Sequence, residues 1–273
     1  MAFLVGSKGI GTPTWGHSLK VDPYLWSSKL SFLYDIDYLR NIENLYGNEV
    51  LKQYILEKLK AIDKFDDCLV ITDFTQFTWT GTVEDLRGGD SVSWEITTDE
   101  LKCTITTGSI RDDRNAWKYI NFASDMSKLF FSCVYIPSSH ITACDVSRES
   151  GEYTWHDSYE HRWFYSVYTY IPPSASDFRL RRYTSTTEIT LASEPVDLAS
   201  GTPYKVAGYF DVSNHIQKAW REKDPIDLSN PTLSATDTAI SYIKSFRLRA
   251  NAFYENRTYT YRWKVPLIVA WKS

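Results

Sequence analysis

The chain has 273 residues and a formal net charge of −4, and 15% of its residues are aromatic, including 19 Tyr and 10 Trp. This length allows one large β-rich domain or two small ones with a sizeable core. The aromatic content favours strands and excludes disorder as the overall description. No apolar window is long enough for a transmembrane helix, and the apolar run at residues 1–6 is too short for a signal peptide. We therefore expect a protein made in the cytoplasm that does not enter a membrane.

Charge is distributed unevenly along the chain. Residues 66–176 carry 8 basic and 17 acidic side chains, whereas residues 177–273 carry 14 and 10. This asymmetry is compatible with head-to-tail contacts between copies, although a solvated surface gives similar counts. The cysteines lack paired spacing and lie in strand-like runs, which predicts buried, reduced thiols, with two disulfides as the alternative. The four cysteines are Cys68, Cys103, Cys133 and Cys144.

Residues 1–28 are punctuated by Gly, Ser and Pro, which predicts an extended arm. Within this arm, residues 6–11 do not have the spacing of a phosphate-binding loop and lack the flanking strand and helix that such a loop needs. An aromatic-bearing terminal arm can clasp a neighbouring subunit, so its aromatic side chains are candidate interface residues. These candidates are Phe3, Trp15, Tyr24 and Trp26.

Residues 29–66 form the one clear helical region of the sequence. Apolar residues recur at helical spacing between Leu30 and Ile42 and again between Val50 and Ile62. The Gly-Asn pair at residues 47–48 fits a helix C-cap followed by a second helix. The pattern predicts a helical hairpin packed on the β domain.

From Cys68 onward, short apolar–polar alternations separated by turn residues predict strands. The clearest cover residues 91–98, 101–107, 128–136, 141–146, 178–183, 188–191 and 204–212. Between them, residues 108–127 are predicted to be a loop with its own aromatic anchors, and residues 213–220 a short helix. Ten or more strands at this spacing predict a mainly β fold, an antiparallel β-sandwich or jelly-roll-like domain over residues 67–273.

The C-terminal region, residues 240–273, is predicted to be a hairpin of two strands joined by a turn at residues 255–257. Between residues 242 and 254 the even positions form a largely apolar face, and Ser245, Arg247, Arg249 and Asn251 form the other face. The segment 267–271 is apolar on both faces, so it must be covered by the rest of the chain or by another subunit. The number of strands upstream favours a central strand covered by the chain itself.

Two stretches share the sequence Phe-Arg-Leu-Arg, at residues 178–181 and 246–249. If the two strands lie near each other, their arginines and Arg262 form a cationic patch that can meet an acidic protein surface. The arginines lie on strand faces of a net acidic chain, which argues against nucleic-acid binding. The candidate interface residues of this patch are Arg179, Arg181, Arg247, Arg249 and Arg262.

No motif indicates catalysis or a metal site. His156 and His161 are five residues apart, so on a strand they point to opposite faces, and no third histidine is near. Carboxylates are plentiful, but no spacing selects a catalytic pair, and the GxSxG and HExxH motifs are absent. We therefore predict no catalytic residue, no metal and no cofactor, and a protein that is not an enzyme.

A dense aromatic run between Trp155 and Tyr170 supports an alternative function, the binding of glycans. Sugars stack on exposed Trp and Tyr rings while Asp, Asn and Arg form hydrogen bonds beside them. The same aromatic residues alternate along a strand, which is also typical of core positions. The candidate sugar-contacting residues are Trp155, Tyr159, Trp163 and Tyr165.

The extended arm, the apolar C-terminal segment, the Thr- and Tyr-rich strands, the reduced cysteines and the lack of a secretion signal together form a recognisable composition. It resembles that of the virion proteins of tailed phages, a class that includes head decoration, neck and tail proteins. The resemblance implies a non-enzymatic assembly protein of the virion that binds copies of itself or other structural proteins. In such a protein an arm and strand ends add main-chain hydrogen bonds and aromatic anchors to a neighbour.

Overall fold

The computed structural model describes residues 68–71, 73–84, 86, 88–138, 140–151, 163–171, 176–184, 187–222 and 230–272. The structural statements below concern these residues. The arm predicted at residues 1–28 and the helical hairpin predicted at residues 29–66 lie outside them. The one helical element in the described ranges is a 3-10 turn, η4 (Phe74–Gln76). No helix in this part of the chain is long and apolar enough to cross a membrane.

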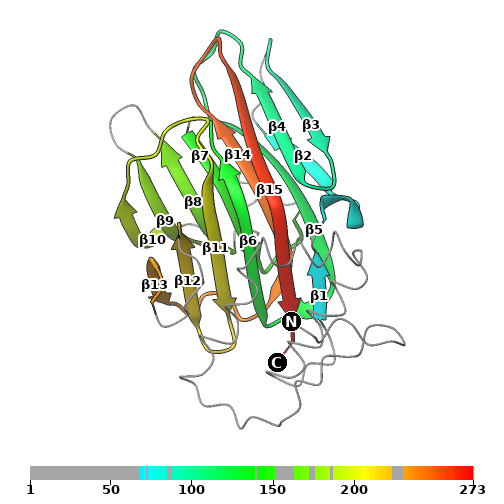
Figure 1. Ribbon diagram of the computed structural model, residues 1–273, viewed down its shortest axis with the longest axis vertical. Helices are drawn as coiled ribbons and strands as arrows, with labels where there is room; N and C mark the ends of the chain where they lie inside the picture. The colour runs from blue at the N-terminus through cyan, green and yellow to red at the C-terminus, as the bar shows by residue number, and fades with distance from the viewer. Residues whose placement is uncertain are drawn as a thin grey trace, which may run out of the picture.

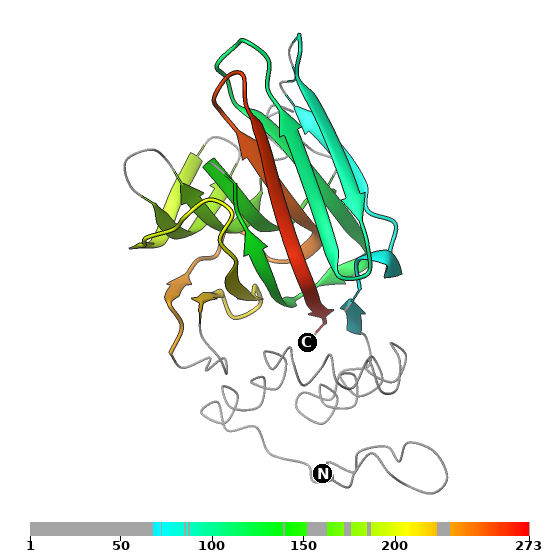
Figure 2. The same ribbon diagram turned by 45° about the horizontal axis from the view of Figure 1, so that its top comes forward.

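The strands form two antiparallel sheets that face each other (Figures 1 and 2). The eight-stranded sheet contains, in spatial order, β13 (Leu233–Thr236), β12 (Ile216–Arg221), β11 (Tyr204–Asp211), β6 (Lys128–Ile136), β15 (Thr258–Trp271), β4 (Glu100–Thr106) and β3 (Ser91–Ile96), with β1 (Cys68–Ile71) also paired to β15. The seven-stranded sheet contains β10 (Thr187–Pro195), β9 (Asp177–Thr184), β8 (Phe164–Ile171), β7 (His140–Ser147), β14 (Ile243–Ala252), β5 (Arg114–Met126) and β2 (Thr80–Glu84).

The core lies between the two sheets and is built from alternate residues of the strands. In β4, Leu101, Cys103 and Ile105 are fully buried, while the residues between them are half-exposed. Aromatic rings join the two layers, since Phe131 of β6 lies 5.7 Å from Phe246 of β14. This period-two burial is what the sequence pattern predicts for strands with one face on a core. The predicted mainly β, antiparallel sandwich is confirmed.

The two C-terminal strands do not pair with each other, so the predicted hairpin is wrong. β14 lies between β7 and β5 in the seven-stranded sheet, whereas β15 lies in the eight-stranded sheet (Figure 1). The turn between them crosses from one layer to the other, and Asn256 adopts the left-handed conformation there with φ 51°. β15 is central, with β6 on one side and β4 and β1 on the other. The apolar segment 267–271 is accordingly buried by the chain itself.

Two further predictions are corrected by the strand pairing. Residues 108–127 are not a loop, because residues 114–126 form β5, which pairs with β14 over residues 114–121 and again at Met126. Residues 213–220 are not a helix, because residues 216–221 form β12, which is held between β11 and β13. In both places pairing with neighbouring strands overrides the local sequence preference.

Candidate functional site

The outer face of the seven-stranded sheet carries an unusual set of side chains. In β5, β14, β7 and β8 one set of alternate residues joins the core between the sheets, and the other set points away from it. We call the outward set the outer face. Its buried polar and aromatic members, each at most 6% exposed, are Asn115, Trp117, Tyr119, Asp145, Ser147, Phe164, Ser166, Tyr168, Ser245, Arg247, Arg249 and Asn251.

Asp145 of β7 lies at the centre of the outer face and is fully buried. It is directly opposite Arg247 in the register of β7 and β14. Its Oδ2 atom lies 3.1 Å from Nε of Arg249 and 3.7 Å from Nη2 of Arg247. Nη2 of Arg249 also donates to Oδ1 of Asp145 at 3.5 Å and to Oγ of Ser166 at 3.3 Å. One carboxylate thus holds two guanidinium groups.

Aromatic rings surround this charged group. The guanidinium carbon of Arg247 lies 4.2 Å from the centre of the Phe164 ring, and the Tyr183 ring is stacked on Phe164 with the ring centres 4.3 Å apart. Such contacts fix the plane of a guanidinium. Trp117 lies on the adjacent strand, and its indole Nε1–H donates to the carbonyl of Gly151 at 3.2 Å.

A pocket with about 240 Å³ of empty space, part of it open to solvent, lies among these groups. Its lining is mixed, with two guanidiniums, a carboxylate, an amide and two aromatic rings. The lining residues are Asn115, Trp117, Asp145, Phe164, Arg247 and Arg249.

Burial and neighbouring charges shift the pKa values of two groups on the outer face, Arg249 and Tyr168. Burial acts to lower the pKa of the Arg249 guanidinium, but the charge of Asp145 and the neighbouring tyrosines raise it overall. Burial raises the pKa of the Tyr168 phenol, which therefore stays neutral. The site is suited to hydrogen bonding and ion pairing with a ligand rather than to proton transfer. Among the described residues, no three His, Cys, Asp or Glu side chains gather as metal ligands.

The chain that follows β7 crosses the outer face and helps to position it. Ser245 donates to the carbonyl of Glu149 at 2.8 Å, and the N–H of Gly151 donates to Oδ1 of Asn121 at 2.8 Å. Gly151 lies directly on the Tyr119 ring, because a Cβ atom there would come within 2.4 Å of it. Only glycine fits this close approach. The indole of Trp117 is thereby fixed in place.

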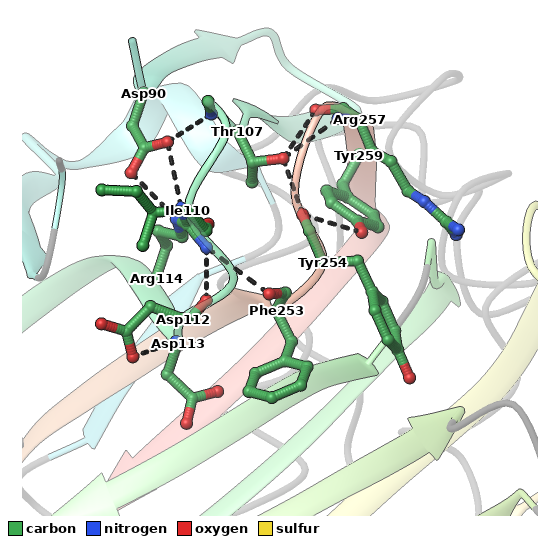
Figure 3. A network of polar contacts seen from close by, with 11 residues as sticks. Asp90, Thr107, Ile110, Asp112, Asp113, Arg114, Phe253, Tyr254, Arg257 and Tyr259 are labelled. Carbon is green, nitrogen blue, oxygen red and sulfur yellow. Dashed lines mark hydrogen bonds and ion pairs between the residues drawn. The ribbon is translucent and has the colours of Figure 1, made fainter. Parts of the chain in front are cut away.

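A buried ion pair fixes the end of the sandwich from which β5 starts (Figure 3). The side chains of Arg114 and Asp90 are both fully buried, and Nε of Arg114 lies 2.9 Å from Oδ2 of Asp90. Oδ1 of Asp90 accepts a second bond from Arg114 at 3.3 Å and one from the N–H of Gly108 at 2.5 Å. The guanidinium also donates to three backbone carbonyls, those of Ile110, Asp112 and Phe253.

Further backbone bonds hold the same loops together (Figure 3). The N–H of Thr107 donates to the backbone carbonyl of Arg257 at 2.8 Å, and the Thr107 hydroxyl donates to the backbone carbonyl of Tyr254 at 2.7 Å. From this anchored end, Asn251 donates to Oδ1 of Asn115 at 2.9 Å. The Arg114 network therefore sets the position at which Asn115 enters the pocket.

The structure does not bring the five predicted arginines into one exposed patch. Arg247 and Arg249 are buried around Asp145, and two strands separate them from β9. On β9, Arg179 pairs with Asp177 and Arg181 pairs with Glu188. Arg262 belongs to the other sheet, where it pairs with Glu100. The arm candidates Phe3, Trp15, Tyr24 and Trp26 lie outside the described residues.

The predicted sugar-contacting residues are also placed differently from expectation. Tyr165 is fully buried and faces the core, where its hydroxyl donates to Oδ1 of Asp237 at 2.8 Å, so it presents no surface to a ligand. Trp163 is half-buried beneath Arg148, whose guanidinium carbon lies 4.3 Å from its ring centre. Trp155 and Tyr159 lie outside the described residues. Of the same aromatic run, Phe164 reaches the pocket because it alternates with Tyr165 along β8.

Four pocket residues were not predicted as site residues: Asn115, Trp117, Asp145 and Phe164. Asn115 and Trp117 lie on β5. This strand is hard to recognise in the sequence because two charged residues, Arg114 and Lys118, occupy core-facing positions. Arg114 is neutralised by Asp90, and Lys118 donates to the carbonyl of Trp79 at 3.3 Å. The strand could have been predicted from its alternation, because Asn115 and Trp117 occupy odd positions and the even positions further along the segment are apolar.

Comparisons with known proteins give similar folds and no family. No protein-family model matches the sequence, and no curated protein matches it. A sialidase matches with TM-score 0.43 and 11% identity over 72% of this chain, which spans 18% of the sialidase chain. Lectin II from Ulex europaeus matches with TM-score 0.47 and 9% identity over 76% of this chain and 99% of the lectin. The carbohydrate-binding module CBM66 from Bacillus subtilis matches with TM-score 0.41 and 9% identity over 64% of this chain and 92% of the module.

None of these three proteins is described as a virion component. Their similarity to this chain is too low to assign it a ligand.

Proposed function

We propose that the protein binds a carbohydrate in the pocket on the outer face of its seven-stranded sheet. The observation that supports this proposal is the lining of the pocket, which combines aromatic rings with a few convergent polar groups. Asp145, Asn115 and Arg249 provide the hydrogen-bonding groups that sugar hydroxyls need, and Trp117 provides an apolar wall.

The polar groups are held in place before a ligand arrives. Asp145 and Arg249 fix each other by an ion pair, and Asn115 is held by the amide of Asn251. Preorganisation of this kind reduces the conformational entropy that binding costs. The empty space of about 240 Å³ includes open solvent, and the enclosed part is about 10 Å³, room for about one water molecule. We therefore expect one substituent of a sugar to enter the pocket while the rest of the glycan stays outside it.

The same lining favours binding without hydrolysis. Most glycoside hydrolases use two carboxyl groups on either side of the scissile bond. Asp145 is the only carboxylate among the described lining residues, and it forms ion pairs with both arginines. A protein that binds a glycan and does not cleave it agrees with the sequence-based prediction that the chain is not an enzyme.

The assembly role predicted from the sequence stays a prediction. It depends on the arm at residues 1–28, which lies outside the described residues, and on an arginine patch that the fold divides between two sheets. Glycan binding, the alternative function predicted from the sequence, has a defined pocket in its support. The two roles are compatible if the sugar-binding protein also forms oligomers.

The test is a glycan array probed with the full-length chain, followed by calorimetry of the sugars that bind. We expect Asp145→Asn and Asn115→Ala to weaken binding at least tenfold, which corresponds to about 1.4 kcal/mol. Glu100→Gln is the matched control, because Glu100 is also a carboxylate paired with an arginine but lies on the other sheet. If no glycan binds, or if both pocket variants bind as tightly as the control, the proposal is wrong.

A further inference from the structure

We propose that one end of the sandwich binds an acidic segment of a partner protein through two arginines and the aromatic rings beside them. This surface lies in the loop before β5 and in the loop between β14 and β15, and it shares no residue with the pocket on the outer face. The inference therefore goes beyond the proposed function and does not depend on it. We call the surface the arginine–tyrosine patch, and its residues are Ile110, Arg111, Phe253, Tyr254 and Arg257.

The first observation is that the two arginines have no anionic partner within the described ranges. Arg111 and Arg257 are both exposed, and their guanidiniums form neither an ion pair nor a hydrogen bond with any described residue. Every other arginine that the structure describes is paired with a carboxylate. The N–H donors of these two guanidiniums are thus available to a ligand.

Carboxylates lie in the same loop, but they are directed elsewhere. Asp112 accepts a hydrogen bond from the N–H of Asp113 at 2.9 Å, and Asp113 accepts one from the amide of Asn251 at 3.3 Å. Neither forms an ion pair with Arg111 or Arg257. The loop therefore contains acidic side chains that could neutralise the arginines and does not use them for this purpose.

The second observation is that both arginines lie over the same aromatic ring. The guanidinium carbons of Arg111 and Arg257 are each 5.1 Å from the centre of the Tyr254 ring, so they are at most twice that distance apart. Arg111 also lies 4.8 Å from the centre of the Phe253 ring, which meets Tyr254 edge to face. Contact with a ring holds a guanidinium and leaves its N–H edge free for a bidentate bond to a carboxylate.

The third observation is that hydrogen bonds fix the loops beneath the patch. The N–H of Asn256 donates to the carbonyl of Gly108 at 2.8 Å, and the Thr107 hydroxyl donates to the carbonyl of Tyr254 at 2.7 Å. The Tyr254 ring points away from the Arg114 network that holds the same loops (Figure 3). A surface that is ordered before binding loses little conformational entropy when a partner arrives.

The composition of the patch favours a protein partner over a nucleic acid or a polysaccharide. Tyr, Phe and Arg are enriched where proteins bind each other, and they contribute much of the binding energy there. Ile110, which is 44% exposed, adds an apolar side chain next to Arg111 in the chain. A nucleic acid is held by many cations along its backbone, whereas the described patch has two. Its chemistry fits two acidic residues on either side of an apolar one.

The test uses the full-length chain and matched pairs of short synthetic peptides. In each pair one peptide has two glutamates flanking a leucine or a phenylalanine, and the other has glutamines in their place. Fluorescence anisotropy gives the dissociation constants. We expect the glutamate peptide to bind at least about tenfold more tightly. The difference should shrink as NaCl rises from about 0.05 to 0.5 M, since salt screens the attraction.

Substitutions then assign this preference to the patch. Arg111→Gln combined with Arg257→Gln removes both charges and keeps the rings, so it should abolish the preference for glutamate. Tyr254→Ala should weaken the binding of both peptides, whereas Tyr254→Phe keeps the ring and should not. Arg262→Gln is the control, because Arg262 is a partly exposed arginine that pairs with Glu100 on the eight-stranded sheet. Thermal unfolding shows whether each variant is folded, and the peptide comparison on the unsubstituted chain does not depend on the variants.

Equal binding of the glutamate and glutamine peptides overturns the inference. A preference for glutamate that survives in the double variant also overturns it, because the peptide would then bind elsewhere. If heparin or an oligothymidylate binds more tightly than every peptide and loses binding in the double variant, the partner is not a protein. Self-association that blocks the peptide and is lost in the double variant would make a second copy the occupant and would likewise overturn the inference. Glycan binding by the double variant should match that of the unsubstituted chain.

Discussion

The buried pair of Arg114 and Asp90 gives a quantitative prediction for stability. Both side chains are fully buried, and the guanidinium also donates to three loop carbonyls. Arg114→Met leaves the Asp90 carboxylate buried without its cation. Removing one partner of a buried ion pair costs about 3–5 kcal/mol, because the other charge is left uncompensated. The free energy of unfolding falls by about 2 kcal/mol per M of urea, so the urea concentration at the unfolding midpoint should fall by about 1.5–2.5 M.

The measurement is urea unfolding followed by Trp fluorescence, carried out as a double-mutant cycle with Asp90→Val. We expect the double variant to be more stable than the sum of the two single effects implies, by at least about 2 kcal/mol, because it leaves no unpaired buried charge. The control is Arg262→Met, whose side chain is 38% exposed in its pair with Glu100 and should cost at most about 1 kcal/mol. Additive single effects at Arg114 and Asp90 would refute the assignment of a coupled buried pair.

Two other predictions concern titratable groups. Burial raises the pKa of the Cys103 and Cys144 thiols, so at pH 8 both should react with a thiol reagent at least about 100-fold faster in denaturant than in the native protein; rapid native reaction would contradict their burial. Burial acts to raise the pKa of Asp211, but hydrogen bonds from Asn214 and Ser213 and the charge of Lys128 lower it overall. The folded pKa is below the unfolded one, so this carboxylate stabilises the fold above about pH 4 and the effect is lost as the pH falls through the folded pKa. In Asp211→Asn the free energy of unfolding should therefore fall less steeply as the pH is lowered below about 4 than in the unsubstituted protein. Parallel curves of unfolding free energy against pH for the two proteins would contradict this.

The strands that the sequence predicts well are those with one wholly apolar face. In β4 and β6, alternate positions are filled by apolar residues that meet the core, so the period of two is visible in the sequence. Residues 128–136 were predicted with the bounds that β6 has. Burial on one face imposes this pattern, and turn residues mark its ends.

The site could not be predicted in the same way, because its position depends on pairing between distant strands. Asp145 meets Arg249 only because β7 and β14 are neighbours, although about a hundred residues separate them in the chain. The sequence shows that odd positions from Ser245 to Asn251 share a face, but not that this face is covered. Local alternation predicts which residues lie together on one strand, whereas the partner strand is set by the topology of the whole domain.

The two buried arginine clusters differ in a way that bears on function. Arg114 is matched by one carboxylate and three carbonyls, so its cluster is balanced and serves to hold three loops together. Arg247 and Arg249 both pair with Asp145 on the outer face, beside the pocket. Buried ion pairs are weak contributors to stability, and well-packed apolar residues in their place are often as stable or more so. If the second cluster served only the fold, replacing Asp145, Arg247 and Arg249 together by apolar residues of similar volume should keep or raise the unfolding midpoint. We expect that triple variant to fold and to lose glycan binding, which would separate the role of this cluster from that of Arg114.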